Sequence, residues 1–418
     1  MKKLFILGLC LMAVAGASAQ KSLVKEVEGK AKGFNADYAA ARNQLKPALT
    51  NPETQNEAQT WYVAGTVEFG DFDNMYGKQA EGQGKEEEKA AMGRALINGY
   101  NYFMTAFPLD TIVEVDKKTG APKLNKDGSP KTKTKYSKDM VKKLTAHWND
   151  YVSGGQYLWD AKDYDGAYEA WNIYTSMPAN PSLGSDAPAV PADTVIGQMC
   201  FYQGLAAWQA EKLDVALERF EKAYANNYHS PQMFDYAIGV AAQMKDDPKI
   251  IELAETANKL YGDTLSNYLL IIINDKINNK KYEEAQTLLE KAISMNPTQA
   301  ELYDVLGILY QSQNNLEKAR ENFAKAISMK PDFVKAKFDL GRAIYAQAGA
   351  IDEASANLPT EEFNKVRAEK VTPLLKESIP YLEEALNDST TFDDARLLLR
   401  SIYYTLDDAV NLKRIEAM

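Results

Sequence analysis

Residues of the same chemical type recur every 34 or 35 positions along much of this 418-residue chain. Windows that share one pattern start at Gly197, Pro231, Ser266, Ala300 and Val334. A fixed period of about 20 to 50 residues is typical of folds in which one short unit is repeated and each copy packs on its neighbours. The period therefore predicts a repeat architecture rather than one globular core.

The clearest copy of the pattern spans residues 300–333. Tyr303, Leu306 and Tyr310 lie at helical spacing and form one apolar stripe. Gly307 leaves room for a second helix to approach closely, and Pro331 ends that second helix. The positions that carry the pattern are Tyr303, Leu306, Gly307, Tyr310, Ala319, Phe323, Ala326 and Pro331.

At all eight positions this window resembles the tetratricopeptide repeat (TPR), a helix–turn–helix unit. The resemblance implies an all-α fold, a right-handed TPR superhelical solenoid of about eight helix pairs with loop insertions and a C-terminal capping helix pair. We expect the following organisation: a signal peptide at 1–19, TPR-like helix pairs at 20–108 with an insertion at 70–94, a Lys-rich insert with a small hairpin at 109–138, a TPR at 139–181, a Pro-rich loop at 182–196, tandem TPRs at 197–348, an insertion at 349–373, and a completing helix with the cap at 374–418.

The N-terminus has the composition of a secretory signal peptide. Lys2 and Lys3 precede an apolar run at 4–14, and a cleavage site of small residues follows at 17–19. We expect cleavage before Gln20 and an exported protein, periplasmic or associated with the outer envelope of a Gram-negative bacterium. No later stretch reaches the roughly 18 apolar residues of a membrane-spanning helix, so no transmembrane segment is expected.

The composition argues against most enzyme chemistry and against nucleic acid. The formal net charge is −10, whereas nucleic-acid binders present basic surfaces. The chain has only two His and two Cys, without metal-ligand spacing, and shows neither a Gly-rich phosphate loop nor a nucleophile with its base. We therefore expect no catalytic residues, no metal and no cofactor, and the sequence indicates a non-enzymatic protein.

The TPR resemblance indicates where a partner would bind. In that family, four positions of each first helix line a concave groove. Mapped onto this chain, they give these candidate partner-binding residues: Tyr62, Phe69, Gln156, Trp159, Phe201, Trp208, Asn274, Lys335, Phe338 and Arg342. Rigid rings in a groove suit peptides and apolar side chains. The sequence therefore favours a scaffold or adaptor that binds a protein or peptide. The alternative is a carbohydrate- or small-ligand-binding envelope protein that uses the groove aromatics.

One TPR subtype can be tested on the sequence. Co-chaperone TPRs clamp a C-terminal carboxylate with Lys, Asn and Arg side chains from three successive repeats. Asn274 and Lys335 match that pattern, but Leu270, Val305 and Asp339 do not. Because an acid at 339 repels a buried carboxylate, the carboxylate clamp is rejected.

Two surface features complete the sequence-based expectations. Asp followed by Ser or Thr and then an apolar residue or Thr resembles the O-glycosylation site of some Gram-negative envelope proteins, and it predicts modification at Thr111, Thr194, Thr264 and Ser389, all in expected loops. The Lys-rich insert at 109–138 fits two interpretations, an interaction arm or a solvated loop.

Overall fold

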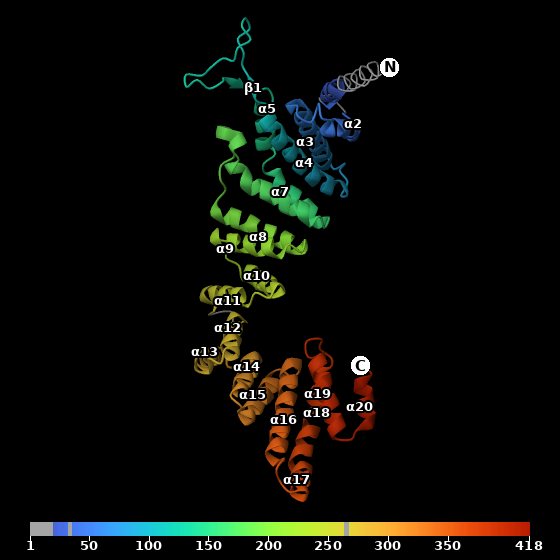
Figure 1. Ribbon diagram of the computed structural model, residues 1–418, viewed down its shortest axis with the longest axis vertical. Helices are drawn as coiled ribbons and strands as arrows, with labels where there is room; N and C mark the ends of the chain where they lie inside the picture. The colour runs from blue at the N-terminus through green and yellow to red at the C-terminus, as the bar shows by residue number, and fades with distance from the viewer. Residues whose placement is uncertain (1–19, 32–35, 263–266) are drawn as a thin grey trace, which may run out of the picture. The chain divides into compact units, whose positions relative to one another are not determined.

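The structure of the protein is a computed structural model that describes residues 20–31, 36–262 and 267–418. Helices make up nearly all of the regular structure, so the expected all-α fold is confirmed (Figure 1). The chain divides into two compact units, one ending at Lys245 and the other beginning at Asp246, and each unit is described by itself. The predicted signal peptide lies outside the described residues.

The first unit begins with a helical segment at 20–31 and continues through nine labelled α-helices. Its elements are α2 (Tyr38–Thr50), α3 (Ala58–Ala80), α4 (Glu88–Leu109), β1 (Ile112–Val113), β2 (Thr132–Lys133), α5 (Ser137–Ala146), α6 (Asp150–Asp160), α7 (Tyr164–Ser176), the short 3₁₀ helices η1 (Met177–Ala179) and η2 (Pro181–Asp186), α8 (Asp193–Gln209), α9 (Leu213–Ala225) and α10 (Pro231–Met244). Consecutive helices pack as pairs, α3 with α4, α6 with α7 and α8 with α9.

The second unit repeats this arrangement. Its elements are α11 (Asp247–Tyr261), α12 (Asn267–Asn278), α13 (Tyr282–Met295), α14 (Ala300–Ser312), α15 (Leu316–Met329), α16 (Val334–Ser355), α17 (Thr360–Val366), the π-helical turn η3 (Arg367–Val371), α18 (Thr372–Ala385), α19 (Phe392–Thr405) and α20 (Ala409–Glu416). The pairs here are α12 with α13, α14 with α15, α16 with α18, and α19 with α20.

One contact recurs at the centre of the helix pairs. A glycine of the first helix faces a large side chain of the second helix so closely that a Cβ atom would lie 2.3 to 2.8 Å from that side chain. These contacts join Gly65 to Phe103, Gly155 to Trp171, Gly204 to Phe220, Gly307 to Phe323 and Gly341 to Leu382. The facing side chains are buried. The glycine therefore sets how closely the two helices of a pair approach each other.

The turn between the helices of a pair also recurs. In each turn, the residue two positions before the next helix begins adopts the left-handed conformation, with φ between 54° and 61°. These residues are Lys162, Glu211, Lys280, Asn314 and Asp407. The following N–H closes the helix end on a carbonyl five residues back, as Asp163 does on Leu158 at 2.8 Å. This hydrogen bond offsets the roughly 1 kcal/mol that a non-glycine residue loses in this conformation.

Three segments differ from the sequence-based boundaries. Residues 70–94 lengthen α3 and α4 rather than form a separate insert, because Phe72, Met75 and Met92 continue the buried stripes. Residues 349–373 form the end of α16, then α17, η3 and the start of α18, and Val371 is buried. The Pro-rich loop ends at Ala192, because α8 begins at Asp193.

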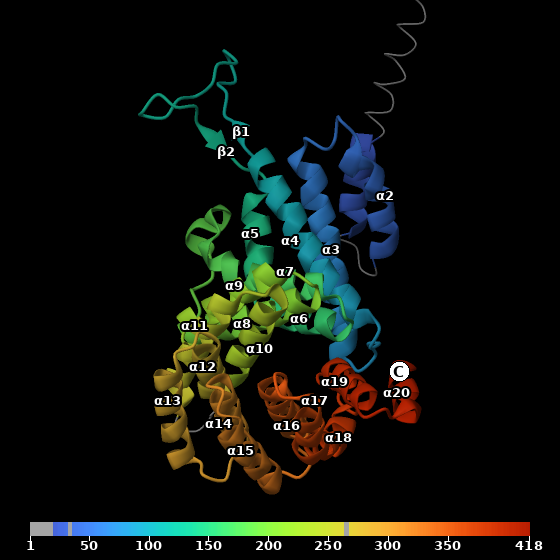
Figure 2. The same cartoon turned by 60° about the horizontal axis from the view of Figure 1, so that its bottom comes forward.

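Residues 111–135, which we call the arm, project from the helices of the first unit (Figures 1 and 2). Strands β1 and β2 pair antiparallel at its base, with Ile112 opposite Lys133 and Val113 opposite Thr132. The arm is followed by α5, most of which lies within the TPR expected at 139–181, but the helix pair there consists of α6 and α7 and leaves α5 outside it.

An aromatic pocket in the candidate binding groove

The first unit contains an apolar cavity of about 150 Å³ at the predicted groove positions. Helix α6 contributes Gln156 and Trp159, α7 contributes Trp171, and α8 contributes Tyr202 and Leu205. We call this cavity the aromatic pocket. Gln156 and Trp159 are two of the predicted groove residues, so the structure brings part of the predicted set together. Trp171 was missed because its repeat position is one of helix packing, and Tyr202 was missed because it lies outside the four groove positions.

The pocket has one fixed wall and two accessible rings. The Trp171 ring packs against Gly155, its indole N–H donates to the Val152 carbonyl at 3.1 Å, and it is buried. Trp159 and Tyr202 are half-buried, and their ring centroids lie 6.4 and 5.5 Å from that of Trp171. The pocket is therefore preformed, since its back wall cannot move without disturbing the α6–α7 packing.

Trp159 differs from the other tryptophans in its hydrogen bonding. Each of the other four indole N–H groups donates to an acceptor of the protein. Three bind backbone carbonyls (Trp61 to Gln55, Trp148 to Tyr174 and Trp171 to Val152), and Trp208 binds the Gln243 amide oxygen. Within the described part of the chain, the Trp159 indole N–H has no such acceptor. This donor at the pocket is therefore available to a ligand.

The polar side chains around the pocket form hydrogen bonds with each other. The Gln156 amide donates to Asp160 at 2.8 Å, and the Gln198 amide donates to the Tyr202 hydroxyl at 3.0 Å. The pocket thus offers apolar contact and one free indole donor to a ligand. The side chains of Gln156 and Gln198 already bind other side chains of the protein.

Tyr62 and Phe69, both predicted groove residues, are buried, which corrects that assignment. The segment around α5 covers them. The Tyr62 hydroxyl donates to Asp139 at 2.9 Å, and its ring stacks on Tyr136 at 4.5 Å. Phe69 stacks on His147 at 5.0 Å. Burial, reinforced by the Asp139 contact, raises the pKa of the Tyr62 hydroxyl.

Phe201 and Phe338 are also buried and need the same correction. Phe201 stacks on Tyr228 at 5.1 Å, because the chain between α9 and α10 folds over it. Phe338 packs into the core of the second unit with Leu375 and Leu382 of α18. Trp208 stays half-buried beside Tyr236, with ring centroids 5.5 Å apart.

In the second unit, predicted residues Lys335 and Arg342 belong to a charged cluster rather than to an open groove. The Lys335 ammonium lies 2.7 Å from carboxylate oxygens of both Asp304 and Asp339. Arg342 pairs with the other Asp339 oxygen at 2.5 Å. Both carboxylates are buried, whereas the two cations are about half exposed. Lys335 is neutralised by two acids and is not available to a ligand carboxylate. This arrangement therefore agrees with the rejection of the carboxylate clamp.

Asp304 is the acid of this cluster whose pKa is raised. Burial of its carboxyl raises the Asp304 pKa to about 6, Lys335 opposes the shift, and Asp339 adds to it. One Asp304 oxygen is buried and has no hydrogen-bond partner among the residues that the structure describes. The folded state therefore holds a proton on this carboxyl at a pH where the unfolded chain has released it.

This proton gives a testable pH dependence. Because the folded pKa of Asp304 lies above its unfolded value, its contribution to stability is fully present below about pH 4 and is lost as the pH rises through about 6. Relative to Asp304→Asn, the wild type should lose on the order of 2 kcal/mol of unfolding free energy between pH 4 and 7. Urea unfolding of both proteins across this range measures the difference. Parallel pH profiles would contradict a raised Asp304 pKa.

Asn274, also predicted, belongs to the second unit. It is half-buried and lines an open cavity of about 480 Å³ between α11 and α12, together with Ile250, Ile271 and Asp275. The aromatic pocket and the charged cluster belong to different units.

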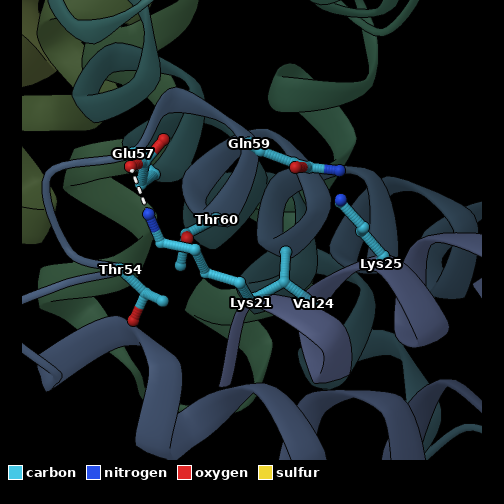
Figure 3. Close-up of a pocket in the computed structure, with 7 residues that line it drawn as sticks. All are labelled: Lys21, Val24, Lys25, Thr54, Glu57, Gln59 and Thr60. Atoms are coloured by element: carbon cyan, nitrogen blue, oxygen red, sulfur yellow. Dashed lines mark hydrogen bonds and ion pairs between the residues drawn. The ribbon is translucent and has the colours of Figure 1, made fainter. Parts of the chain in front are cut away.

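A third cavity, of about 200 Å³, lies where the helical segment 20–31 meets the start of α3 (Figure 3). Its lining residues largely bind one another or their surroundings. Lys21 pairs with Glu57 at 3.0 Å, and the Gln59 amide donates to Glu28 at 2.7 Å. The Thr54 hydroxyl donates to the Ala48 carbonyl. We therefore favour the aromatic pocket as the ligand site.

Other predicted features can be placed only in part. Thr111 and Ser389 are exposed in loops, whereas exposed Thr194 lies in the first turn of α8 and not in a loop. Thr264 lies outside the described residues. Across residues 20–31, 36–262 and 267–418, no three His, Cys, Asp or Glu side chains are grouped so that they could hold a metal ion. The helices within these ranges include none that is long and apolar enough to cross a membrane.

Comparison with known families identifies the repeats. Three models of the tetratricopeptide repeat match residues 276–299, 288–321 and 305–356. Residues 276–356 are tetratricopeptide repeats. The matched region contains the α14–α15 pair with its Gly307–Phe323 contact, so the TPR assignment made from the eight-position pattern is confirmed there.

Individual relatives are more distant. The antiviral innate immune response effector IFIT1 of Macaca fascicularis is 23% identical over 192 residues, which cover 44% of this chain and 39% of that protein. The match thus spans well under half of the relative's length. Among solved structures, human IFIT1 dimer with m7Gppp-AAAA has a TM-score of 0.40 at 15% identity, covering 94% of this chain and 76% of that one. YrrB, a TPR protein with an unusual peptide-binding site, has a TM-score of 0.35 at 17% identity, covering 48% and 96%.

Proposed function

We propose that this protein is a non-enzymatic scaffold of the bacterial envelope that binds a peptide segment of a partner protein, with one apolar side chain of the partner held in the aromatic pocket. The observation that carries the proposal is the preformed pocket between α6 and α8, at groove positions of two successive first helices. TPR proteins act as protein-binding scaffolds, and the repeats at 276–356 are of this type.

The size and chemistry of the pocket fit a peptide anchor. An apolar cavity of about 150 Å³ accommodates one benzene-sized group, which corresponds to a Leu, Ile or Phe side chain. The free Trp159 indole N–H can donate to a backbone carbonyl next to that side chain. Aromatic residues in a desolvated pocket typically supply most of the energy of such an interface.

The second candidate function is carbohydrate binding, and it is favoured by the accessible Trp159 and Tyr202 rings, on which a sugar face can stack. A sugar face stacks on a ring, but its hydroxyls also need hydrogen-bond partners. The polar groups around this pocket, Gln156 and Gln198, already bind Asp160 and Tyr202. We therefore place peptide binding first.

Replacing Trp159 tests the proposal. Random 12-residue peptides are selected by display against the immobilised full chain, and the enriched peptides are synthesised for calorimetry. Trp159→Ala should weaken their binding by about 30-fold or more, as expected for a central aromatic anchor. Trp159→Phe, which keeps a ring but loses the N–H group, should fall between Ala and wild type.

The matched control removes an aromatic ring outside the pocket. Tyr404 in α19 is 74% exposed, so Tyr404→Ala should leave peptide binding unchanged. Unchanged circular dichroism and unfolding midpoints show that the variants are folded. Peptides that bind wild type and Trp159→Ala equally would disprove the pocket as the anchor site. Thermal stabilisation by mono- or oligosaccharides that is lost in Trp159→Ala would favour the carbohydrate alternative.

The envelope part of the proposal rests on the sequence of residues 1–19 and has its own tests. N-terminal sequencing of the protein purified from a Gram-negative host should begin at Gln20, and the protein should fractionate with the periplasm or outer envelope. Intact mass of the protein from its native cells should exceed the unmodified value if Thr111, Thr194, Thr264 or Ser389 is glycosylated. A retained Met1 would contradict export by this route.

A further inference from the structure

The arm has a defined backbone although all its residues except Glu114 are exposed. Three chain segments meet at its centre in a closed ring of backbone hydrogen bonds. The Glu114 N–H donates to the Lys131 carbonyl, the Lys131 N–H to the Lys123 carbonyl, and the Lys123 N–H to the Glu114 carbonyl, at 2.7 to 2.8 Å. Two turns extend from this junction, at residues 116–121 and 125–129. The arm therefore has the form of a branched hairpin with two tips (Figures 1 and 2).

The base of the arm is fixed to the helical body by one buried carboxylate. Asp110, at the end of α4, accepts hydrogen bonds from the backbone N–H groups of Lys135, Tyr136 and Ser137 and from the Ser137 hydroxyl. Its oxygens lie 2.7 to 3.0 Å from these donors, and Asp110 is 1% exposed. The arm is thus presented at a set position rather than on a free linker.

The acidic side chains of the arm point into its own framework. Asp116 accepts from the N–H groups of Lys118 and Thr119, which lowers the Asp116 pKa. Asp127 accepts from the hydroxyl and N–H of Ser129. Glu114 lies 3.7 and 3.8 Å from the ammonium groups of two lysines at the junction. The three acids of the arm therefore contribute to its folding, and the lysines outnumber them.

The lysines face outward. The arm has seven lysines against three acids, a net charge of +4 in a chain of net charge −10. Within the part of the chain that the structure describes, Lys117, Lys118, Lys126 and Lys133 form no ion pair. Lys117 and Lys118 belong to one tip and Lys126 to the other. The arm therefore concentrates positive charge on a protein that is acidic elsewhere.

Aliphatic side chains accompany these cations. Ile112, Val113, Val115 and Leu124 are 41% to 63% exposed on the arm, so the arm presents apolar surface to water. Lysines attract an anionic surface of any kind, whereas exposed aliphatic residues gain free energy only where they leave water. A ligand that matches the whole arm must offer both a layer of negative charge and an apolar layer next to it.

We propose that the arm is a peripheral membrane anchor that binds the surface of a bilayer containing anionic lipid. Phosphate headgroups are complementary to the outward lysines, and the acyl boundary beneath them takes up the aliphatic side chains. A bilayer imposes no fixed shape, so a small exposed arm can bind it without the roughly 1,000 Å² of matched surface that a stable protein interface needs. This binding is separate from the aromatic pocket and leaves the pocket free.

Vesicle binding of the full chain tests the proposal. Flotation with vesicles of 70% phosphatidylcholine and 30% phosphatidylglycerol should recover the protein, and vesicles of phosphatidylcholine alone should not. The triple variant Lys117→Gln, Lys118→Gln, Lys126→Gln should reduce partitioning about 100-fold, at roughly five-fold per lysine near an anionic surface. The matched control is Lys78→Gln, Lys259→Gln, Lys376→Gln, which removes three exposed helical lysines elsewhere and should change partitioning only slightly.

A second variant separates a membrane from a soluble polyanion. Val115→Ser with Leu124→Ser keeps every charge and should weaken vesicle binding at least five-fold, while leaving retention on a heparin column unchanged. Equal vesicle binding by wild type and this double variant would mean that the arm recognises charge alone, which would overturn the assignment to a membrane. Absence of binding to the anionic vesicles, or equal loss in the two lysine triple variants, would overturn it as well.

Discussion

Gly307→Leu should destabilise the second unit by about 3 kcal/mol, the upper end of what overpacking a core usually costs. A Cβ atom on Gly307 would lie 2.5 Å from the Phe323 ring, and Phe323 is fully buried, so the ring has no free volume into which it can move. Leucine adds three further carbons at the same point. The two helices must therefore separate, which exposes the apolar stripes that they bury against each other.

The same substitution at a second glycine provides the control. Gly349 lies in α16 of the same unit, and no atom lies within 4 Å of a Cβ built there. Gly349→Leu should be neutral or stabilising by up to about 1 kcal/mol, because leucine has the higher helix propensity. Urea unfolding of both variants measures the contrast. Equal stability of the two variants would show that the Gly307–Phe323 contact does not set the helix spacing.

Arg42→Ala should cost about 3 to 5 kcal/mol, because it leaves a buried carboxylate without its partner. The Arg42 guanidinium binds both oxygens of Glu68, at 2.7 and 2.9 Å, and also Asp71 at 2.6 Å. The Glu68 side chain is 2% exposed. The hydrogen bonds to Glu68 raise the pKa of Arg42, so the guanidinium stays charged at any pH at which the protein is folded.

Two further variants show whether the cost comes from the stranded charge. Arg94→Ala removes an arginine from an exposed pair with Asp163 and should cost less than about 1 kcal/mol. Adding Glu68→Gln to Arg42→Ala should recover part of the lost stability, since the amide has no charge to desolvate. Chemical denaturation of the three variants gives these differences. A cost for Arg42→Ala no larger than that for Arg94→Ala would refute the buried-pair argument.

The repeat period predicted the contacts that depend on the spacing of residues within one helix pair. Gly307 and Phe323 were placed correctly because TPR packing fixes their separation, and the Gly65–Phe103 and Gly341–Leu382 contacts show the same geometry across longer pairs. The period does not predict the segments that belong to no repeat. Helix α5 has no place in the repeat, yet it covers Tyr62 and Phe69 and removes them from the groove.

The candidate site was predicted only in part for a related reason. Groove positions identify which side of a first helix faces the partner, and this sufficed for Gln156 and Trp159. Whether a ring at such a position is accessible depends on which segment lies over it. Phe201 is covered by Tyr228, which follows α9, and this contact is not encoded in the repeat spacing. The Arg42–Glu68 pair likewise follows from burial, which no local pattern of charges reveals.

The left-handed turns have an evolutionary consequence. Lys162, Glu211 and Lys280 occupy a conformation that their side chains do not favour, whereas Asn314 and Asp407 are of types that adopt it more often. Helix packing and the closing backbone hydrogen bond, rather than residue identity, therefore keep each turn in place. Such a chain can gain or lose a complete helix pair by duplication or deletion without a change in the turns of the remaining pairs. Its copies can then diverge in sequence while the 34-residue step persists.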